Sequence, residues 1–289
     1  MPACPICGSS TAPVGTKHGD YSGRDFDVVR CTECRFAFVA DPWTEYDKIY
    51  GDDYYAGKGV DPLVDYVHEL AAPDRTIRQH EWRGIGRLVG ELTTLTPQTT
   101  WLDHGCGTGG LVTYVNAQGL AQAEGFEEGW SEPRLRERGV PTVSRADLDA
   151  RENAYDVITS IEVIEHVPDP VGLLKDLARL LKPGGVLFLT TGNAAPYADG
   201  LLDWRYVTPE IHISFFEPPT LARAMTEAGL VPEAGGFRPG WDDIIRFKLL
   251  KNLRRQDTSP LEAAMPWGIV TRALDRRMKI SAHPIGRKP

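Results

Sequence analysis

Between residues 97 and 235, short apolar runs alternate with longer segments whose apolar residues recur every three or four positions. The short runs predict β-strands, and the longer period predicts amphipathic helices. Four strand-like runs lie at residues 99–103, 123–127, 156–160 and 186–190. Residues 171–181 form a helical segment, which the following Lys-Pro-Gly-Gly ends. Strands that alternate with helices predict an α/β fold with a doubly wound, mostly parallel sheet.

Residues 41–96, which precede this alternation, predict a helical connector. Apolar residues at helical spacing run from about residue 62 to residue 92, and Pro73 interrupts them, so we expect two helices. Before them, a stretch rich in Gly and Asp contains four tyrosines: Tyr46, Tyr50, Tyr54 and Tyr55. These rings either pack between neighbouring units or form a lid over a ligand.

Residues 236–289 form a basic C-terminal extension, with twelve Lys or Arg against five Asp or Glu and a net charge of +7. Ile245, Leu249 and Leu253 recur at helical spacing within it. We interpret the extension as a helix with a solvated face. The alternative is a dock for an anionic substrate or partner.

The composition excludes several classes of protein. Of the 289 residues, 42% are hydrophobic and 25% are charged, which is typical of a globular chain and not of a disordered one. The net charge of −8 is unfavourable for nucleic-acid binding, which needs clustered Lys and Arg. Apolar runs stay shorter than the ~18 residues of a membrane span, and the N-terminus lacks a signal-peptide pattern. We therefore predict a cytoplasmic protein.

Four of the five cysteines fall in the first 34 residues, as the two close pairs Cys4/Cys7 and Cys31/Cys34. Two such turns supply four thiolates, which is the ligand set of a structural zinc site. Residues 1–40 therefore predict a small zinc-binding ribbon, and the alternative is four ordinary buried cysteines. The ribbon has four basic and four acidic residues, so its net charge is zero, which is unfavourable for nucleic-acid binding.

The first strand-like run ends in Asp103, and a glycine-rich turn with Gly105 and Gly107 follows. Glycines let a ligand approach the backbone closely, and such a turn suits either a dinucleotide or the amino-acid part of S-adenosylmethionine. Asp103 would repel a pyrophosphate and attract an ammonium group. Glu127 ends the next strand-like run, where a carboxylate can accept both ribose hydroxyls.

With its later motifs, this region resembles the class I S-adenosylmethionine-dependent methyltransferases. The matching segments occur in that family's order and are residues 102–109, Glu127, 146–148, 155–158, 165–170 and 181–185. The resemblance implies a Rossmann-like sheet of seven strands over residues 97–235. It also implies cofactor roles for Asp103, Gly105 and Gly107 (methionine moiety), Glu127 (ribose), Asp147 and Leu148 (adenine), and Ser160 and Ile161 (sulfonium).

Methyl transfer from a sulfonium is an in-line displacement, so the enzyme must align the acceptor and, where necessary, deprotonate it. Glu162, Glu165 and His166 would share one face of a helix that starts near Ile161, and His212 would join them. This pattern resembles the ubiquinone-pathway O-methyltransferases and the metal-dependent RNA 2′-O-methyltransferases. The resemblance implies that a Mg²⁺-type divalent ion binds there and lowers the pKa of an acceptor hydroxyl.

Two other interpretations of these residues remain open. Glu165 and His166 can simply satisfy a helix start, and His166 or His212 can act as a general base without a metal. Residues 191–219, rich in aromatic residues, follow the fourth strand-like run and form either a substrate wall or ordinary loop packing.

The sequence therefore predicts methyl transfer from S-adenosylmethionine to a hydroxyl or amine of a small molecule. The alternatives are a C-methyltransferase acting on a sugar or polyketide-type acceptor, an RNA methyltransferase, and a scaffold protein with a degenerate cofactor fold. A homodimer is compatible with the sequence, which does not determine the oligomeric state.

Overall fold

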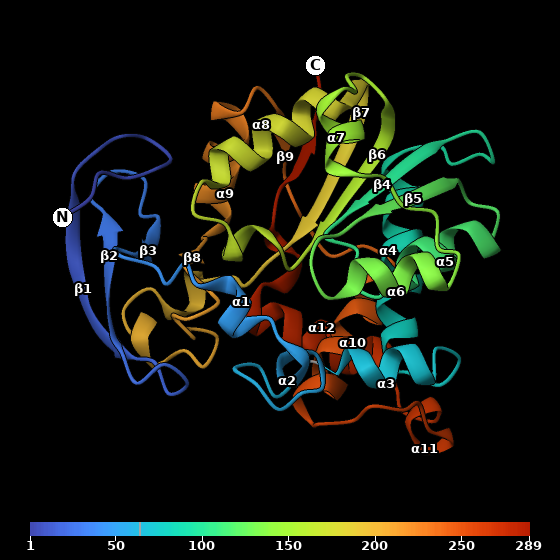
Figure 1. Ribbon diagram of the computed structural model, residues 1–289, viewed down its shortest axis with the longest axis horizontal. Coiled ribbons are helices and arrows are strands. Elements are labelled where there is room, and N and C mark those ends of the chain that lie inside the picture. The colour runs from blue at the N-terminus through green and yellow to red at the C-terminus, as the bar shows by residue number, and fades with distance from the viewer. Residues whose placement is uncertain (64) are drawn as a thin grey trace.

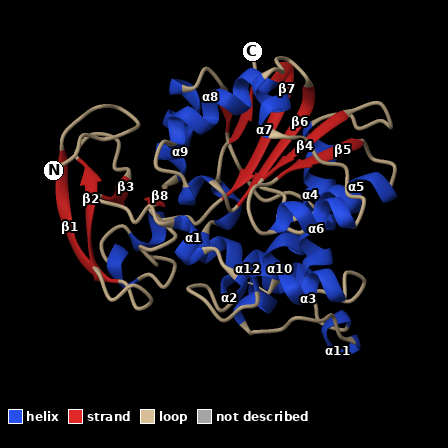
Figure 2. Ribbon diagram, viewed as in Figure 1, coloured by secondary structure: helices blue, strands red, loops and turns tan. Residues whose placement is uncertain are grey.

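Two β-sheets organise the computed structural model, which describes residues 1–63 and 65–289. A small four-stranded sheet lies beside a larger six-stranded sheet flanked by helices (Figures 1 and 2). The small sheet comprises β1 (Thr11–His18), β2 (Asp25–Cys31), β3 (Ala37–Val39) and β8 (Ser214–Phe215). The large sheet has the order β5-β4-β6-β7-β10-β9. Its strands are β4 (Thr100–His104), β5 (Gln122–Phe126), β6 (Tyr155–Ile161), β7 (Leu181–Thr190), β9 (Val231–Glu233) and β10 (Ile285–Arg287).

The helices connect these strands in the predicted alternation. They are α1 (Tyr46–Ile49), α2 (Asp52–Tyr55), α3 (Tyr66–Ala71), α4 (Arg78–Leu92), α5 (Gly110–Ala117), α6 (Ser131–Glu137), α7 (Arg145–Asp149), α8 (Pro170–Leu180), α9 (Pro218–Glu227), α10 (Trp241–Asn252), α11 (Pro260–Ala263) and α12 (Trp267–Met278). Short 3-10 turns lie at Ile164–His166, Ala195–Tyr197, Leu201–Asp203 and Ile280–Ala282. The two helices expected around Pro73 are α3 and α4.

The doubly wound α/β sheet is confirmed, with one correction to its size. Strands β4, β5, β6 and β7 are parallel, and β10 is antiparallel to both β7 and β9. Across the described residues the sheet has six strands, not seven. Next to β5, Thr142 forms an isolated parallel bridge with Gly125. Pairing stops there because Ser144 caps α7 two residues later.

Alternate residues of the central strands face two different cores. Trp101, Val157 and Val186 pack with α4, α5 and α10. Their neighbours Leu102, Ile158 and Leu187 pack with α8 and α9 on the opposite face. Because both faces are covered by helices, each of these strands has consecutive apolar residues, such as Trp101 and Leu102 or Val157 and Ile158, which is why they are recognisable in the sequence.

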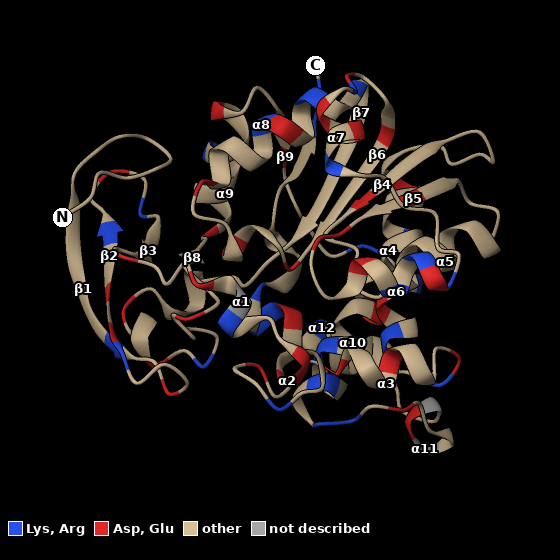
Figure 3. Cartoon of the chain, viewed as in Figure 1, with Lys and Arg blue, Asp and Glu red and all other residues tan. Residues whose placement is uncertain are grey.

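The basic C-terminal extension has a solvated helix face in α12, where Arg272, Arg276 and Arg277 are exposed, but that interpretation does not hold for α10, whose apolar residues are mostly buried. Helix α10 packs on α4, and β10 inserts into the large sheet between β7 and β9. Ile245 is buried, whereas Leu253 is 63% exposed, so the assumed apolar stripe does not follow the buried face. Helix α10 carries two acidic residues in its first turn, which its basic residues follow, and α12 carries one acidic residue among its arginines (Figure 3). The domain boundary placed after residue 235 stays a prediction. The large sheet includes strands from before and after this position.

Candidate active site

The glycine turn after β4 lines a cleft at the carboxyl end of the parallel strands. Gly105, Gly107 and Gly109 all have positive φ angles, of 77°, 55° and 72°. At Gly105 a side chain would also clash, because a Cβ there would lie 2.4 Å from Val163. Left-handed backbone and close packing explain why glycine recurs in this turn.

Asp103 lies at the base of this cleft and is almost completely buried. The hydroxyl of Thr159 donates to its Oδ1 at 2.7 Å. Burial, reinforced by the nearby Glu127 carboxylate, raises the pKa of Asp103 to about 7. A buried carboxylate without a cationic partner is suited to a ligand that brings a positive charge, such as an ammonium group.

Glu127 follows β5 and points back to the glycine turn. Its Oε2 accepts from the Gly107 amide at 2.7 Å, and its Oε1 accepts from the Glu128 amide at 3.0 Å. Burial raises the pKa of Glu127. The carboxylate is therefore placed by two backbone amides, beside the turn that Asp103 begins.

The cleft opens to solvent. Of the predicted cofactor residues, Asp103, Gly105, Gly107 and Ile161 line it. Glu127 and three other predicted cofactor residues are not among the residues that line it. Ser160 and Leu148 are buried, and Asp147 is exposed and forms a capping box with Ser144. The adenine and sulfonium roles of these three residues stay predictions.

Sequence reasoning missed Arg78, which lines the same cleft from the first turn of α4. Its guanidinium donates to Glu69 at 2.8 Å and to Glu81 at 2.8 Å, and all three side chains are at least 85% buried. Tyr66 also lines the cleft. The only available signal was an Arg and two Glu within a segment of otherwise helical periodicity, which is equally typical of a solvated helix.

The raised pKa of Asp103 predicts a pH-dependent cofactor affinity. Only the ionised carboxylate attracts an ammonium group, so acidification through pH 7 should weaken binding. We expect the Kd for S-adenosylmethionine, measured by calorimetry, to rise about tenfold between pH 8 and pH 6. Asp103→Asn should bind weakly at every pH and lose this slope. A flat profile for the wild type would contradict the assignment of the ammonium group to Asp103.

A second group of side chains gathers beyond the end of β6. Ligand atoms of Glu165, His166 and His212 all lie within 4.8 Å of one another. Nδ1 of His166 lies 2.8 Å from the Ile211 carbonyl oxygen, and Nδ1 of His212 lies 2.7 Å from the Tyr206 carbonyl oxygen. A carbonyl oxygen only accepts, so each Nδ1 carries the proton. Both Nε2 atoms therefore have a free lone pair, as metal-binding or proton-accepting imidazoles require.

Glu165 is completely buried, and its environment is short of positive charge. Its Oε1 accepts from the Tyr206 hydroxyl at 2.5 Å, and its Oε2 has no hydrogen-bond partner among the described residues. Burial, followed by the charge of Glu162, raises the pKa of Glu165 to about 8. Burial also lowers the pKa of His166 to about 3, which keeps this imidazole neutral. An orphaned carboxylate oxygen beside two neutral imidazoles fits a bound cation.

The expected helix from Ile161 does not form, and Glu162 is not in this group. Strand β6 continues to Ile161, Glu162 adopts a φ of 55°, and only Ile164–His166 form a 3-10 turn. The Glu162 carboxylate instead accepts from Lys248 of α10 at 2.8 Å and from Thr190 at 2.9 Å. Lys248 comes from the C-terminal segment, so local spacing could not reveal it.

Two tyrosines of the connector lie close to the predicted site residues, one beside His166 and the other beside the segment that follows Glu127. The Tyr50 hydroxyl lies 3.2 Å from Nδ1 of His166. The Tyr55 ring stacks on Trp130, just after Glu127, with 4.4 Å between ring centroids. The connector therefore reaches both the segment that follows Glu127 and the group that contains His166.

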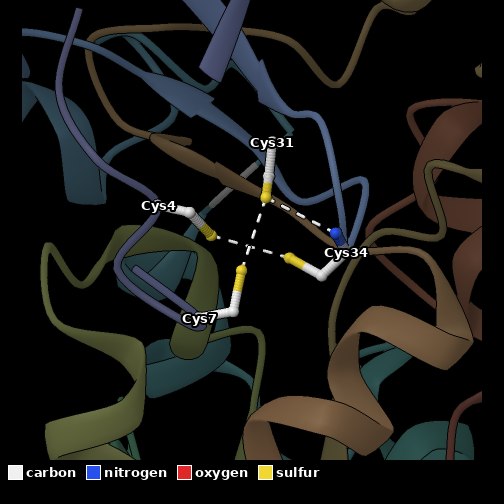
Figure 4. Close-up of side chains that lie close together, drawn as sticks. All are labelled: Cys4, Cys7, Cys31 and Cys34. Atoms are coloured by element: carbon white, nitrogen blue, oxygen red, sulfur yellow. Dashed lines mark hydrogen bonds between the residues drawn. The ribbon is translucent and has the colours of Figure 1, made fainter. Parts of the chain in front are cut away.

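The four N-terminal cysteines converge, as Figure 4 shows. The Sγ atoms of Cys4 and Cys34 lie 3.6 Å apart, and those of Cys7 and Cys31 lie 3.4 Å apart. The backbone amides of Glu33 and Cys34 both point to the Cys31 sulfur at 3.4 Å. Four sulfurs at these separations, with amide donors to one of them, fit a tetrahedral thiolate site.

The sheet, the glycine turn and the two acidic strand ends define a class I S-adenosylmethionine-dependent methyltransferase. Residues 63–234 match the methyltransferase domain family, and the chain belongs to this family. In the described part of the chain, no helix is long and apolar enough to cross a membrane.

Similar curated proteins are ubiquinone biosynthesis O-methyltransferases. The protein from Methylococcus capsulatus is 33% identical over 147 residues, and the protein from Aeromonas salmonicida is 35% identical over 150 residues. Each match covers 45% of this chain and 62% of the relative. The chain therefore spans about three fifths of the length of these relatives.

Two solved structures share the fold. One is a chain from a complex of the Haloferax volcanii Trm112 methyltransferase activator with a methyltransferase, at 16% identity and a TM-score of 0.50, covering 78% of this chain and 98% of that chain. The other is a Haemonchus contortus phosphoethanolamine N-methyltransferase in complex with S-adenosylmethionine, at 14% identity and a TM-score of 0.51, covering 88% of this chain and 62% of that chain.

Proposed function

We propose that this enzyme transfers the methyl group of S-adenosylmethionine to a hydroxyl group of a small-molecule metabolite. The observation that carries this proposal is the group formed by Glu165, His166 and His212, in which both imidazoles present an unprotonated Nε2. Activating a hydroxyl requires either a cation beside it or a base that takes its proton. The named function of the curated relatives, methylation of oxygen in ubiquinone biosynthesis, supports the same choice.

The cofactor would lie along the glycine turn. Asp103 would hold the ammonium group, Arg78 the carboxylate and Glu127 the ribose hydroxyls, while Ile161 would border the sulfonium. During transfer, the acceptor oxygen forms a bond to the methyl carbon, and the carbon–sulfur bond breaks with its electrons left on sulfur. The enzyme contributes alignment of the two reactants and removal of the hydroxyl proton.

Glu165, His166 and His212 would hold a divalent ion, which when bound would lower the pKa of the acceptor hydroxyl. Two imidazoles with one carboxylate favour a first-row transition ion over Mg²⁺, which prefers oxygen ligands. In the metal-free alternative, the neutral Nε2 of His212 accepts the hydroxyl proton directly.

Glu165→Gln tests the metal site. We expect wild-type enzyme to bind Mn²⁺ in calorimetry and Glu165→Gln to bind it at least about tenfold more weakly. The matched control Glu91→Gln, which alters an exposed carboxylate on α4, should bind Mn²⁺ like the wild type.

The same variants test the function itself. With a panel of phenols and catechols as acceptors, Glu165→Gln should lower turnover by about 100-fold or more. Unchanged turnover would reject the proposal. Normal turnover without any Mn²⁺ binding by the wild type would select the metal-free alternative. Chelators must be avoided here because they would also strip the N-terminal cysteines.

We also propose that Cys4, Cys7, Cys31 and Cys34 bind a structural Zn²⁺ ion. Four thiolates leave no open coordination position, so this ion would stabilise the ribbon and take no part in chemistry.

A further inference from the structure

We propose that the N-terminal ribbon is a positioning element for the catalytic histidines. It would hold residues 206–215, the segment that supplies His212 and both carbonyl oxygens that orient the imidazoles. This inference rests on the proposed roles of Glu165, His166 and His212. It makes the ribbon part of the acceptor side of the active site and not a separate binding module.

The first contact is a shared β-sheet. Strand β8, which starts two residues after His212, pairs with β3 of the ribbon, with Ala37 opposite Phe215 and Phe38 opposite Ser214. The amide of Val39 donates to the Ile213 carbonyl at 2.9 Å, and the amide of Ile213 donates to the Glu165 carbonyl at 2.8 Å. Ile213 thus links the ribbon directly to the backbone of Glu165.

The second contact involves a buried carboxylate, Glu210, which is only 2% exposed. Its Oε1 accepts from the amide of Tyr21 at 3.1 Å, and from the amide and hydroxyl of Ser22 at 3.3 Å. All three donors belong to the turn between β1 and β2. At Gly19 in this turn, a Cβ would lie 2.3 Å from the same oxygen, so the ribbon closes tightly around the carboxylate. The next residue, Ile211, supplies the carbonyl that orients His166.

The third contact connects the cysteine cluster to residues 217–220, just beyond the C-terminal end of the segment. Cys31 ends β2, and the Cys31–Cys34 turn leads into β3. The Cys34 carbonyl accepts from the Thr220 hydroxyl at 2.9 Å, and Arg35 pairs with Glu217 at 3.0 Å. A metal ion that ordered this turn would therefore fix the register of β3 and, through β3, the position of β8.

Among the described residues, neither Asp103 nor Glu127 forms a hydrogen bond or ion pair with the ribbon. Asp103 is held by Thr159, and Glu127 is held by the amides of Gly107 and Glu128, all within the large-sheet domain. Loosening the ribbon should consequently disturb the histidines and spare S-adenosylmethionine binding. This separation distinguishes a positioning role from general support of the fold.

The test uses full-length protein labelled with ¹⁵N-histidine, with His166 and His212 assigned from His→Gln variants. Long-range ¹H–¹⁵N spectra report which ring nitrogen carries the proton. We expect both rings of the wild type to be protonated at Nδ1 alone. In Glu210→Ala, His166 should no longer be protonated at Nδ1 alone. The Ile213 amide hydrogen of this variant should exchange with solvent at least about tenfold faster than in the wild type.

Three further protein samples and one affinity measurement complete the experiment. Glu210→Gln, which keeps one acceptor oxygen, should recover most of the wild-type spectrum, and Glu91→Ala should match the wild type. In zinc-stripped wild type, both histidines should lose the uniform protonation at Nδ1. One equivalent of Zn²⁺ should restore it. The Kd for S-adenosylmethionine should change less than about twofold in Glu210→Ala.

Unchanged histidine spectra in both Glu210→Ala and the zinc-stripped protein would overturn the proposal. A parallel loss of S-adenosylmethionine affinity would also overturn it, because the ribbon would then support the whole domain. Neither readout needs an acceptor or turnover. A failure of the proposed hydroxyl methylation would therefore be seen separately, in the assays of Glu165→Gln.

Discussion

Glu127→Ala is expected to weaken S-adenosylmethionine binding by roughly 100-fold. This carboxylate would accept two hydrogen bonds from the ribose, and charge-assisted bonds of this kind are the strong ones, so their joint loss corresponds to about 2.7 kcal/mol. The backbone amides of Gly107 and Glu128, which now hold the carboxylate, would remain in place. Calorimetry at pH 8, where Asp103 is ionised, gives the affinity.

The neighbouring Glu128 provides a matched control for this substitution. Its side chain is 65% exposed and lies 3.4 Å from Arg145 on the surface. Glu128→Ala should therefore bind S-adenosylmethionine within about twofold of the wild type, as surface substitutions usually do. Equal losses in the two variants, or normal affinity in Glu127→Ala, would contradict the ribose assignment.

Arg78→Ala is expected to destabilise the fold by about 3–5 kcal/mol, because it leaves two buried carboxylates without their shared cation. Glu69 and Glu81 are only 10% and 4% exposed. The guanidinium also lies 4.7 Å from the centre of the Phe247 ring, which links α4 to the C-terminal helix α10. We expect the melting temperature to fall by on the order of 10 °C.

Two further proteins isolate the electrostatic cause. Arg75→Ala removes a 71% exposed guanidinium that pairs with Asp257, and should cost less than about 1 kcal/mol. The triple variant Arg78→Met, Glu69→Gln, Glu81→Gln should regain most of the lost stability, because no buried charge is left unpaired. If Arg78→Ala melts like Arg75→Ala, the buried ion pairs do not stabilise this region. The triple variant should still bind S-adenosylmethionine weakly.

The local structures that the sequence predicted correctly are those that a short segment defines. The turn that contains Gly105 and Gly107 follows an apolar strand and needs left-handed backbone, so its residues carry a local signal. Two Cys-x-x-Cys pairs likewise predict a cluster, and their sulfurs converge. The helix predicted from Ile161 failed because Glu162 adopts a positive φ at the end of β6, a conformation that periodicity does not reveal.

The sequence by itself therefore determined the class of sheet, the glycine turn with its acidic neighbours and the cysteine cluster, since each is written in residues close together along the chain. Only the tertiary structure decided which charges share a site. It brought Lys248 to Glu162, Arg78 to the cofactor cleft and the ribbon to residues 206–215. These contacts join segments up to about two hundred residues apart. The packing of whole elements selects such partners, and no local pattern of polar and apolar residues encodes them.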